Sequence, residues 1–397
     1  MQLTRLLRCE AVTPGEMIET ASARTALRCG GRHVLAIQDT TVTRSQGGGG
    51  LYLHGMIAVD AEDGAILGPV HGAFLRRTVG QRGTQRLRSI EEKESWRWLE
   101  GAQRAAQVCA RAAKITVIAD RESDIYEAFT RRPANVELLI RAAKDRHLEE
   151  MSLFAHVDAS PVQARLELEL PAQPGRKARR AQLVLRFAKV DLRRPRKGIY
   201  KDAPASTPVH IVDVREVDAP PGEPPIHWRL LTTHAVLDAA AAFEVVDLYR
   251  RRWAIEQLFR TMKTQGFDVE GLRIEEEAPF ANLAMAIFIA AVIVQQLVHA
   301  REGATEQGSL RPLTDAFEPH DQALLEAFNT KLEGKTAKQQ NPHPKASLAF
   351  AAWVCARLGG WNCYYGKPGP ITMLNGWREF QAAKRGVALI KTSLQNV

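Results

Sequence analysis

The sequence VLAIQDTT at residues 34–41 decides the fold class, because it is an apolar, β-branched run that reaches a carboxylate. Such a run predicts a buried strand ending at Asp39. The run ITVIAD at residues 115–120 has the same form and ends at Asp120. The elements predicted around these two are strands at residues 51–59, 65–77 and 136–144, and helices at residues 90–113 and 124–132. This order predicts an α/β layer rather than an all-β barrel.

Asp39 and Asp120 are candidates for a shared cation site. Ligands of open α/β sheets gather at the ends of strands, where both aspartates are predicted to lie. Together with a glutamate from a later helix, they would form an oxygen cage for a hard cation such as Mg²⁺. An aspartate at a strand end is also a common turn former, and this alternative stays open for each residue taken alone.

The stretch YRRRWAIEQLFRTMK at residues 249–263 is predicted to be helical, with its polar side chains on one face. At about 100° per residue, five of them fall within roughly 80° of one another. These are Tyr249, Arg252, Glu256, Arg260 and Lys263. One carboxylate among cations and a phenol suits a site where Glu256 holds a metal and its neighbours grip phosphates. Because arginines lie four residues either side of Glu256, a ladder of salt bridges is the alternative.

The sequence pattern changes at residues 148–233, where short runs of alternating apolar and polar residues are separated by turns rich in proline and glycine. This pattern predicts a β-rich insertion. Basic residues in its turns suit a phosphate backbone, and a solvated surface is the alternative. They are Arg176, Lys177, Arg179, Arg180, Arg193, Arg194, Arg196 and Lys197.

Helical texture resumes after the insertion. The apolar run at residues 283–294 is too short to span a bilayer and predicts a buried helix that begins at Asn282. Residues 322–333 and 345–358 are predicted to form two more helices, the second capped by Gly359 and Gly360.

Composition narrows the class of protein. The 397 residues include 54 lysines and arginines against 45 acidic residues, a net charge of +9 that favours a polyanionic partner. The N-terminus has no long apolar stretch and therefore no secretory signal. Five cysteines without metal-ligand spacing suggest reduced thiols in a cytoplasmic protein that has no membrane partner.

The motifs IQDTT and VIADRESDIY, followed by the spacing Tyr-x2-Arg-x3-Glu-x6-Lys, resemble the DDE transposases of bacterial insertion sequences. The closest resemblance is to the insertion-sequence-four group, which carries this YREK signature and includes the Tn-five transposase. EKESWRWLE at residues 92–100 and ARLGGW at residues 356–361 belong to the same resemblance. It covers most of the chain from about residue 34.

The resemblance implies a ribonuclease-H-like mixed sheet interrupted by the β-rich insertion and followed by a helical C-terminal region. The implied segments are a short helical N-terminal part at residues 1–32, the core at 33–147 and 237–302, the insertion at 148–236, and a dimerisation region at 303–397. It also implies an endonuclease that cuts transposon ends and joins their 3′ hydroxyls to target DNA. The catalytic and metal-binding triad would be Asp39, Asp120 and Glu256, holding two Mg²⁺ ions that Mn²⁺ can replace.

The same resemblance assigns DNA contacts. Tyr249, Arg252 and Lys263 would hold phosphates near the cut, with Arg260 assisting. Trp228 would stack on a base flipped out of a DNA hairpin intermediate, and a core position in a strand is its alternative. Trp253 would pack near the site, and Arg121 and Arg141 match basic positions beside it.

Only 38 residues precede Asp39, where the family carries a helical domain that binds transposon ends. This departure opens a second hypothesis, a truncated remnant that binds DNA or dimerises, and inhibits transposition without completing it. A structure-selective nuclease that cuts branched DNA without joining it is a third. In the leading hypothesis the partners are double-stranded DNA and a second copy of the chain in a synaptic homodimer.

Overall fold

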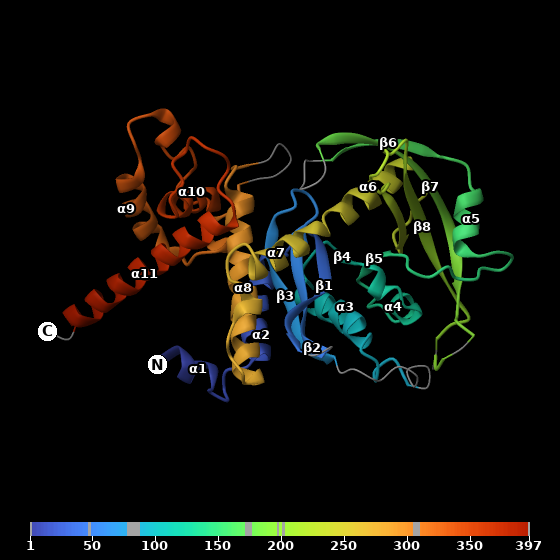
Figure 1. The fold of residues 1–397 in the computed structure, drawn as a ribbon, viewed down its shortest axis with the longest axis horizontal. Coiled ribbons are helices and arrows are strands. Elements are labelled where there is room, and N and C mark those ends of the chain that lie inside the picture. The colour runs from blue at the N-terminus through green and yellow to red at the C-terminus, as the bar shows by residue number, and fades with distance from the viewer. Residues whose placement is uncertain are drawn as a thin grey trace. The chain divides into compact units, whose positions relative to one another are not determined.

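A computed structural model describes residues 2–46, 49–77, 88–170, 177–196, 198–200, 203–304 and 310–395. Within these residues, nine strands form one sheet in the order β3-β2-β1-β4-β5-β9-β8-β7-β6 (Figure 1). In chain order the strands are β1 (His33–Gln46), β2 (Gly49–Asp60), β3 (Ile66–Arg77), β4 (Lys114–Ala119), β5 (Glu137–Arg141), β6 (Ala164–Leu170), β7 (Arg179–Arg193), β8 (Ser206–Val217) and β9 (His227–Thr232). The predicted mixed α/β class is confirmed.

The chain divides into two compact units. The first comprises Met1–Gly30, Thr41–Arg77 and Ala254–Val397, and the second comprises Gly31–Thr40 and Thr78–Trp253. Strand β1 contributes to both, because the division falls between Thr40 and Thr41. The segment bounds expected from the sequence stay predictions.

In the second unit, β1 pairs with β4 and β4 pairs with β5, both in parallel. Helix α3 (Trp96–Val108) packs on β4 and on the short helix α4 (Tyr126–Thr130), as Figure 1 shows in teal. Two expectations need correction. Strand β1 does not end at Asp39 but runs on to Gln46. The helix expected at residues 90–113 is shorter, because the backbone beyond it bonds to the chain before β1, with Gly31 N–H donating to Arg111 O at 2.9 Å.

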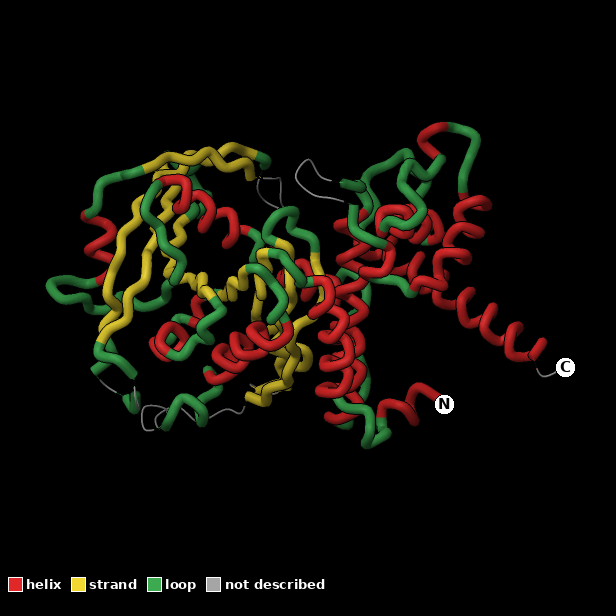
Figure 2. Tube along the Cα trace, turned by 180° about the vertical axis from the view of Figure 1, so that it is seen from behind, coloured by secondary structure: helices red, strands yellow, loops and turns green. Residues whose placement is uncertain are grey.

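The β-rich insertion is confirmed as an antiparallel series in which β6, β7, β8 and β9 pair in turn (Figure 2). The alternating runs of the sequence coincide with these strands, except that the last run continues two residues beyond the end of β9. Strand β9 also pairs with β5, which joins the insertion to the parallel strands. Helix α5 (Leu153–Ala159), which the sequence pattern did not indicate, packs on β7, and helix α6 (Ala239–Arg250) packs on β8. Of the basic turn residues, Arg176 and Lys197 lie outside the described residues.

The first unit contains a three-element layer in which α2 (Pro14–Arg28) and α8 (Glu277–Ala300) pack on β3 and on each other. Short helix α1 (Gln2–Leu7) also packs on α8. Helix α8 is long and apolar enough to span a membrane by length and composition, yet 61% of its most apolar window is buried within the fold. The expected buried helix is confirmed, but it begins earlier: Asn282 is buried inside it, and its amide donates to the carbonyls of Leu7 and Val12.

The rest of the first unit is helical, as expected for the C-terminal region. It consists of α9 (Gln322–Leu332), α10 (Leu348–Leu358) and α11 (Pro370–Gln395). The first two match the expected helices, and Gly359 caps α10. Helix α11 was not expected. Its buried residues Met373, Leu374 and Phe380 belong to one core cluster with α10.

The single helix expected over residues 249–263 is two helices. Helix α6 ends at Arg250, and α7 (Trp253–Lys263) follows after a tight turn. In that turn the N–H groups of Arg251 and Arg252 donate to Leu248 O and Tyr249 O, three residues back instead of four. Arg252 therefore lies between the two helices, and the five polar side chains do not share one continuous helical face.

Candidate functional site

The parallel register of β1 and β4 brings the two aspartates to equivalent places. Ile37 is paired with Ile118, and each aspartate follows two residues later. Because β4 ends at Ala119, Asp120 lies just beyond it, and Asp39 lies where β1 runs past the end of its neighbour. Adjacent parallel strands point the same way, so both carboxylates stand at one edge of the sheet.

Asp39 is held by a backbone amide and an arginine. Its Oδ1 accepts from the Thr40 N–H at 2.7 Å, and its Oδ2 accepts from Arg252 Nη1 at 3.0 Å. Burial raises the pKa of Asp39, and the negative charge of Asp120 adds to that effect, while the Thr40 and Arg252 contacts oppose it. The net shift is upward. The Thr40 amide and the Arg252 guanidinium therefore do not outweigh the effect of burial on the pKa of Asp39.

Tyr249 lies against the second aspartate. Its hydroxyl donates to Asp120 Oδ1 at 3.4 Å, and its side chain is 5% exposed. Burial, reinforced by the charge of Asp120, raises the pKa of Tyr249 to about 12. The phenol therefore stays protonated at neutral pH and acts as a hydrogen-bond donor. Its ring centre lies 5.9 Å from that of Trp228, and the guanidinium of Arg252 lies 6.0 Å from it.

The basic residues predicted beside the site line one hollow of about 200 Å³ in the same unit. Arg121 follows Asp120 directly, and Arg141 ends β5 and donates to His227 O at 3.1 Å. The other lining residues are Ala142, Ala143, Phe154, His227 and Arg229. Because Arg229 is already bonded to Asp158 and Asp213, Arg121 and Arg141 are the residues here that suit an anionic group such as a phosphate.

Three predicted residues lie on α7, in the other compact unit. Glu256 is partly buried, Arg260 is exposed, and Lys263 pairs with Glu270 at 2.7 Å. Among the residues that the structure describes, no three histidine, cysteine, aspartate or glutamate side chains gather in a group that could hold a metal ion. The structure thus brings Asp39 and Asp120 together with Arg252, Tyr249 and Trp228. The role of Glu256 stays a prediction.

The packing of Trp253 near the site stays a prediction. Its side chain is 44% exposed at the start of α7. Its apolar neighbours in the sequence take the buried face, since Ile255 and Leu258 are fully buried. The helical period places Trp253 about 160° from Ile255 and about 140° from Leu258 around the helix axis, which accounts for its exposure.

Arg97 lies within EKESWRWLE, but the sequence did not indicate that it contacts the segments that carry the two aspartates. This residue is 5% exposed and bonds to Thr40, next to Asp39, and to Glu122, two residues after Asp120. The only available signal was a charged residue between two tryptophans at the start of a helix, which does not identify a contact.

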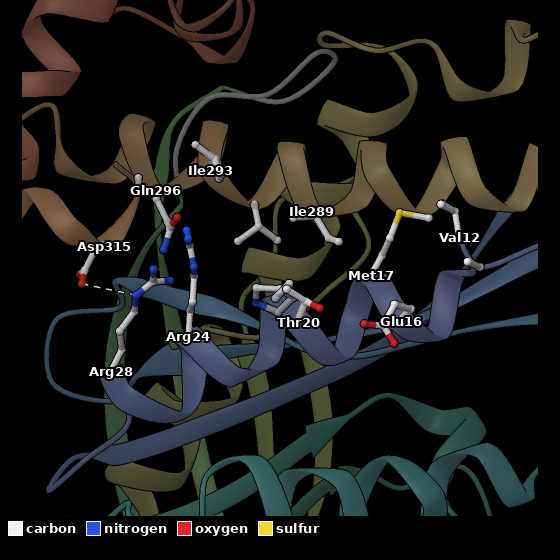
Figure 3. A pocket seen from close by; sticks show the side chains of 15 residues that line it. Val12, Glu16, Met17, Thr20, Arg24, Arg28, Ile289, Ile293, Gln296 and Asp315 are labelled. Atoms are coloured by element: carbon white, nitrogen blue, oxygen red, sulfur yellow. Dashed lines mark ion pairs between the residues drawn. The ribbon is translucent and has the colours of Figure 1, made fainter. Parts of the chain in front are cut away.

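A larger cavity lies in the first unit, between α2 and α8. It has a volume of about 420 Å³, and Figure 3 shows Met17 facing Ile289 across it and Arg24 and Arg28 near Gln296. Its two arginines have partners: Arg28 pairs with Asp315 at 3.6 Å, and Arg24 pairs with Glu318. Carboxylates therefore neutralise both arginines of this cavity.

Residues 95–293, half of the chain, match the family model of the transposase DDE domain. The matched span begins just before α3 and includes Asp120, the insertion, Tyr249, Arg252 and Glu256. Asp39 precedes it, and the parallel register of β1 and β4 places this residue beside Asp120.

Proposed function

The chain belongs to the transposase DDE domain family, and on that premise we propose that it cuts the ends of a mobile DNA element and joins their 3′ hydroxyls to target DNA by metal-dependent phosphoryl transfer. The observation that carries the proposal is the pair of carboxylates at one sheet edge, with Arg252 against Asp39 and Tyr249 against Asp120. The family match favours this function over the non-catalytic remnant.

The donor set suits hard divalent cations. Carboxylate oxygens are the ligands that Mg²⁺ prefers, and the raised pKa of Asp39 indicates that its contacts do not offset the burial of its charge. We propose Asp39, Asp120 and Glu256 as the ligands of two Mg²⁺ ions, with Mn²⁺ as a substitute. Bound cations would activate a water or 3′ hydroxyl for in-line attack on phosphorus and stabilise the leaving oxygen.

The surrounding residues would hold the DNA. Arg252 would move from Asp39 to the scissile phosphate, because a cation at the carboxylate replaces its role there. Tyr249, as a neutral donor, would hydrogen-bond a phosphate oxygen, and Lys263 and Arg260 would contact phosphates further along. Trp228 would stack on a flipped base, an interaction of roughly 1–3 kcal/mol, and Arg121 and Arg141 would receive the adjoining phosphate.

Several finer assignments belong to the same proposal. Membership of the insertion-sequence-four group rests on the unbroken YREK spacing, and a hairpin intermediate follows from that group. A ribonuclease-H-like core is supported by a mixed sheet in which β1, β4 and β5 are parallel. A synaptic homodimer, formed by the helical region at residues 303–397, is supported by the exposed side chains of Leu389 and Ile390 on α11. Action on chromosomal DNA would place the protein in the cytoplasm.

Cleavage by a Glu256→Gln variant tests the proposal. A supercoiled plasmid carrying the DNA on both sides of this reading frame is incubated with protein and Mg²⁺, and nicked, linear and joined products are measured. We expect the wild type to cut at the element ends. The variant should cut at least about 10³-fold more slowly, because the barrier to phosphoryl transfer rises by roughly 4 kcal/mol.

The matched control is Asp158→Asn, a carboxylate of the insertion that is held by Arg215 and Arg229. It should cut at nearly the wild-type rate. Metal-dependent cutting by Glu256→Gln at the wild-type rate would remove Glu256 from the mechanism. Cutting of branched DNA without any joined product would instead favour a structure-selective nuclease.

A further inference from the structure

Arg97 is a buried cation at the beginning of α3, in an unfavourable place for one. It is the second residue of the helix, where the helix dipole favours negative rather than positive side chains. Its guanidinium is nevertheless 6% exposed. A buried charge is costly unless several partners satisfy it, so the contacts of Arg97 explain why it is tolerated there.

Those contacts reach both aspartate-bearing segments. Nε donates to Thr40 Oγ1 at 3.2 Å, and Nη2 donates to Glu122 Oε2 at 2.6 Å. Nη1 donates to the backbone and side chain of Glu94 at 2.8 and 3.0 Å, which anchors the guanidinium to the turn before its helix. Thr40 directly follows Asp39, and Glu122 lies two residues after Asp120.

The strand geometry makes this bridge effective. Successive side chains of a strand point to opposite faces, so Gln38 and Thr40 project to the side of β1 opposite to Asp39. Both are held by the start of α3, because the Gln38 amide donates to Trp98 O at 3.3 Å and Thr40 accepts from Arg97. The backbone on each side of Asp39 is therefore fixed from behind, while its carboxylate faces Arg252.

We propose that Arg97 is a positioning residue that sets the separation of the Asp39 and Asp120 carboxylates and thereby the affinity of the site for divalent cations. This inference rests on the proposed function, in which those carboxylates bind the cations. Arg97 itself touches neither aspartate carboxylate in the contacts that carry the argument. It acts through Thr40 on one side and through the turn after Asp120 on the other.

The test is the dissociation constant of Mn²⁺ for the full chain without DNA. It is measured by titration, with the free Mn²⁺ quantified by electron paramagnetic resonance. Arg97→Gln keeps a polar side chain but removes the fork of donors, and Arg97→Lys keeps the charge. Arg104→Gln, which removes another arginine of the same helix, one that donates to Gln107 Oε1 at 3.0 Å, is the matched control. We expect Arg97→Gln to weaken Mn²⁺ binding about 10- to 100-fold, Arg97→Lys to weaken it less, and Arg104→Gln to leave it unchanged.

Thr40→Val keeps the inference testable if Arg97→Gln fails to fold. This isosteric change removes the hydroxyl that accepts from Arg97, and Thr40→Ser restores it. Weaker Mn²⁺ binding by Thr40→Val with recovery in Thr40→Ser supports positioning, and wild-type affinity in folded Arg97→Gln or in Thr40→Val overturns it. A wild-type chain that binds no Mn²⁺ would instead reject the proposed metal-dependent function, so the two failures are distinguishable.

Discussion

Two regions of the second unit hold pairs of carboxylates in different electrostatic surroundings. In the insertion, Asp213 is fully buried and lies within 4 Å of Arg186, Arg215, Arg229 and His227. Its neighbour Asp158 is bonded by two of the same arginines at 2.7 Å. At the strand edge, Asp39 and Asp120 are held by one arginine and a neutral tyrosine.

The difference shows in the acidity of the two groups. Burial acts to raise the pKa of Asp158, but the hydrogen bonds and charges of Arg229 and Arg215 outweigh it, and the pKa is lowered. For Asp39 burial wins, and the pKa is raised. An excess of arginines marks a carboxylate that stabilises the fold, whereas a deficit marks one that needs a further cation.

The largest expected effect is on catalysis. Asp39→Asn and Asp120→Asn should each reduce Mg²⁺-dependent cleavage of element ends by at least about 10³-fold, because each removes a negatively charged ligand. Asp158→Asn should stay within a few-fold of the wild-type rate. The three rates are compared in one plasmid assay at saturating Mg²⁺. Equal losses in all three variants would break the distinction between the two regions.

A smaller effect is expected from Tyr249→Phe. Loss of the donor to Asp120 or to a phosphate should slow cleavage about 10-fold, the equivalent of roughly 1.4 kcal/mol. Because the pKa of Tyr249 is about 12, its hydroxyl should stay protonated up to about pH 10. The pH–rate profiles of the wild type and Tyr249→Phe should therefore run parallel between pH 7 and 10. A profile in which only the wild type rises with pH would show that Tyr249 acts as a base.

Cation binding should stabilise one region and not the other. At a Mg²⁺ concentration about ten times the dissociation constant, a bound ion adds roughly 1.4 kcal/mol to the free energy of unfolding. Thermal unfolding with Mg²⁺ and with EDTA should show this gain for the wild type and Asp158→Asn but not for Asp39→Asn. A gain of the same size in Asp39→Asn would place the cation elsewhere.

The sequence predicted those features that depend on local pattern. Apolar runs identified β1 and β4, and alternation identified the four strands of the insertion, since the period of a strand is written in neighbouring residues. The apolar runs that lead to Asp39 and Asp120 predicted that both aspartates lie at one edge of the sheet. The parallel register of β1 and β4 agrees with this placement.

Features that depend on distant contacts were not accessible in the same way. The break between α6 and α7 places Arg252 against Asp39, 213 positions away in the sequence. The bonds of Arg97 to Thr40 and Glu122 join three segments, and the burial of Asn282 depends on carbonyls near the N-terminus. The periodicity of one segment does not indicate which residue of another segment it will contact. Arg97, Arg252 and Asn282 therefore look like ordinary helix positions in the sequence.

The smallest effect, on stability, has opposite signs in the two regions. The pKa of Asp39 is raised in the folded chain, so ionisation costs stability as the pH rises above about 4, the ordinary value of an aspartate. The pKa of Asp158 is lowered, so its stabilising contribution is present above about pH 4 and is lost as the pH falls below it. In EDTA at pH 7, Asp39→Asn should raise the Tm by about 1–2 °C. Asp158→Asn should lower it by less, because the Asp158 side chain is 42% exposed and solvent screens its ion pairs.

Both differences from the wild type should shrink toward zero as the pH is lowered below 4, because the native aspartates then become protonated and resemble the asparagines. Asp158 should follow Asp39, since its pKa is lowered and that of Asp39 is raised. Thermal unfolding followed by circular dichroism over this pH range gives both curves. Shifts of the same sign at pH 7 would mean that Arg252 compensates Asp39 as fully as the arginines of the insertion compensate Asp158. The strand edge would then have no unbalanced charge for a cation to neutralise, and its affinity for metal would have to come from Glu256.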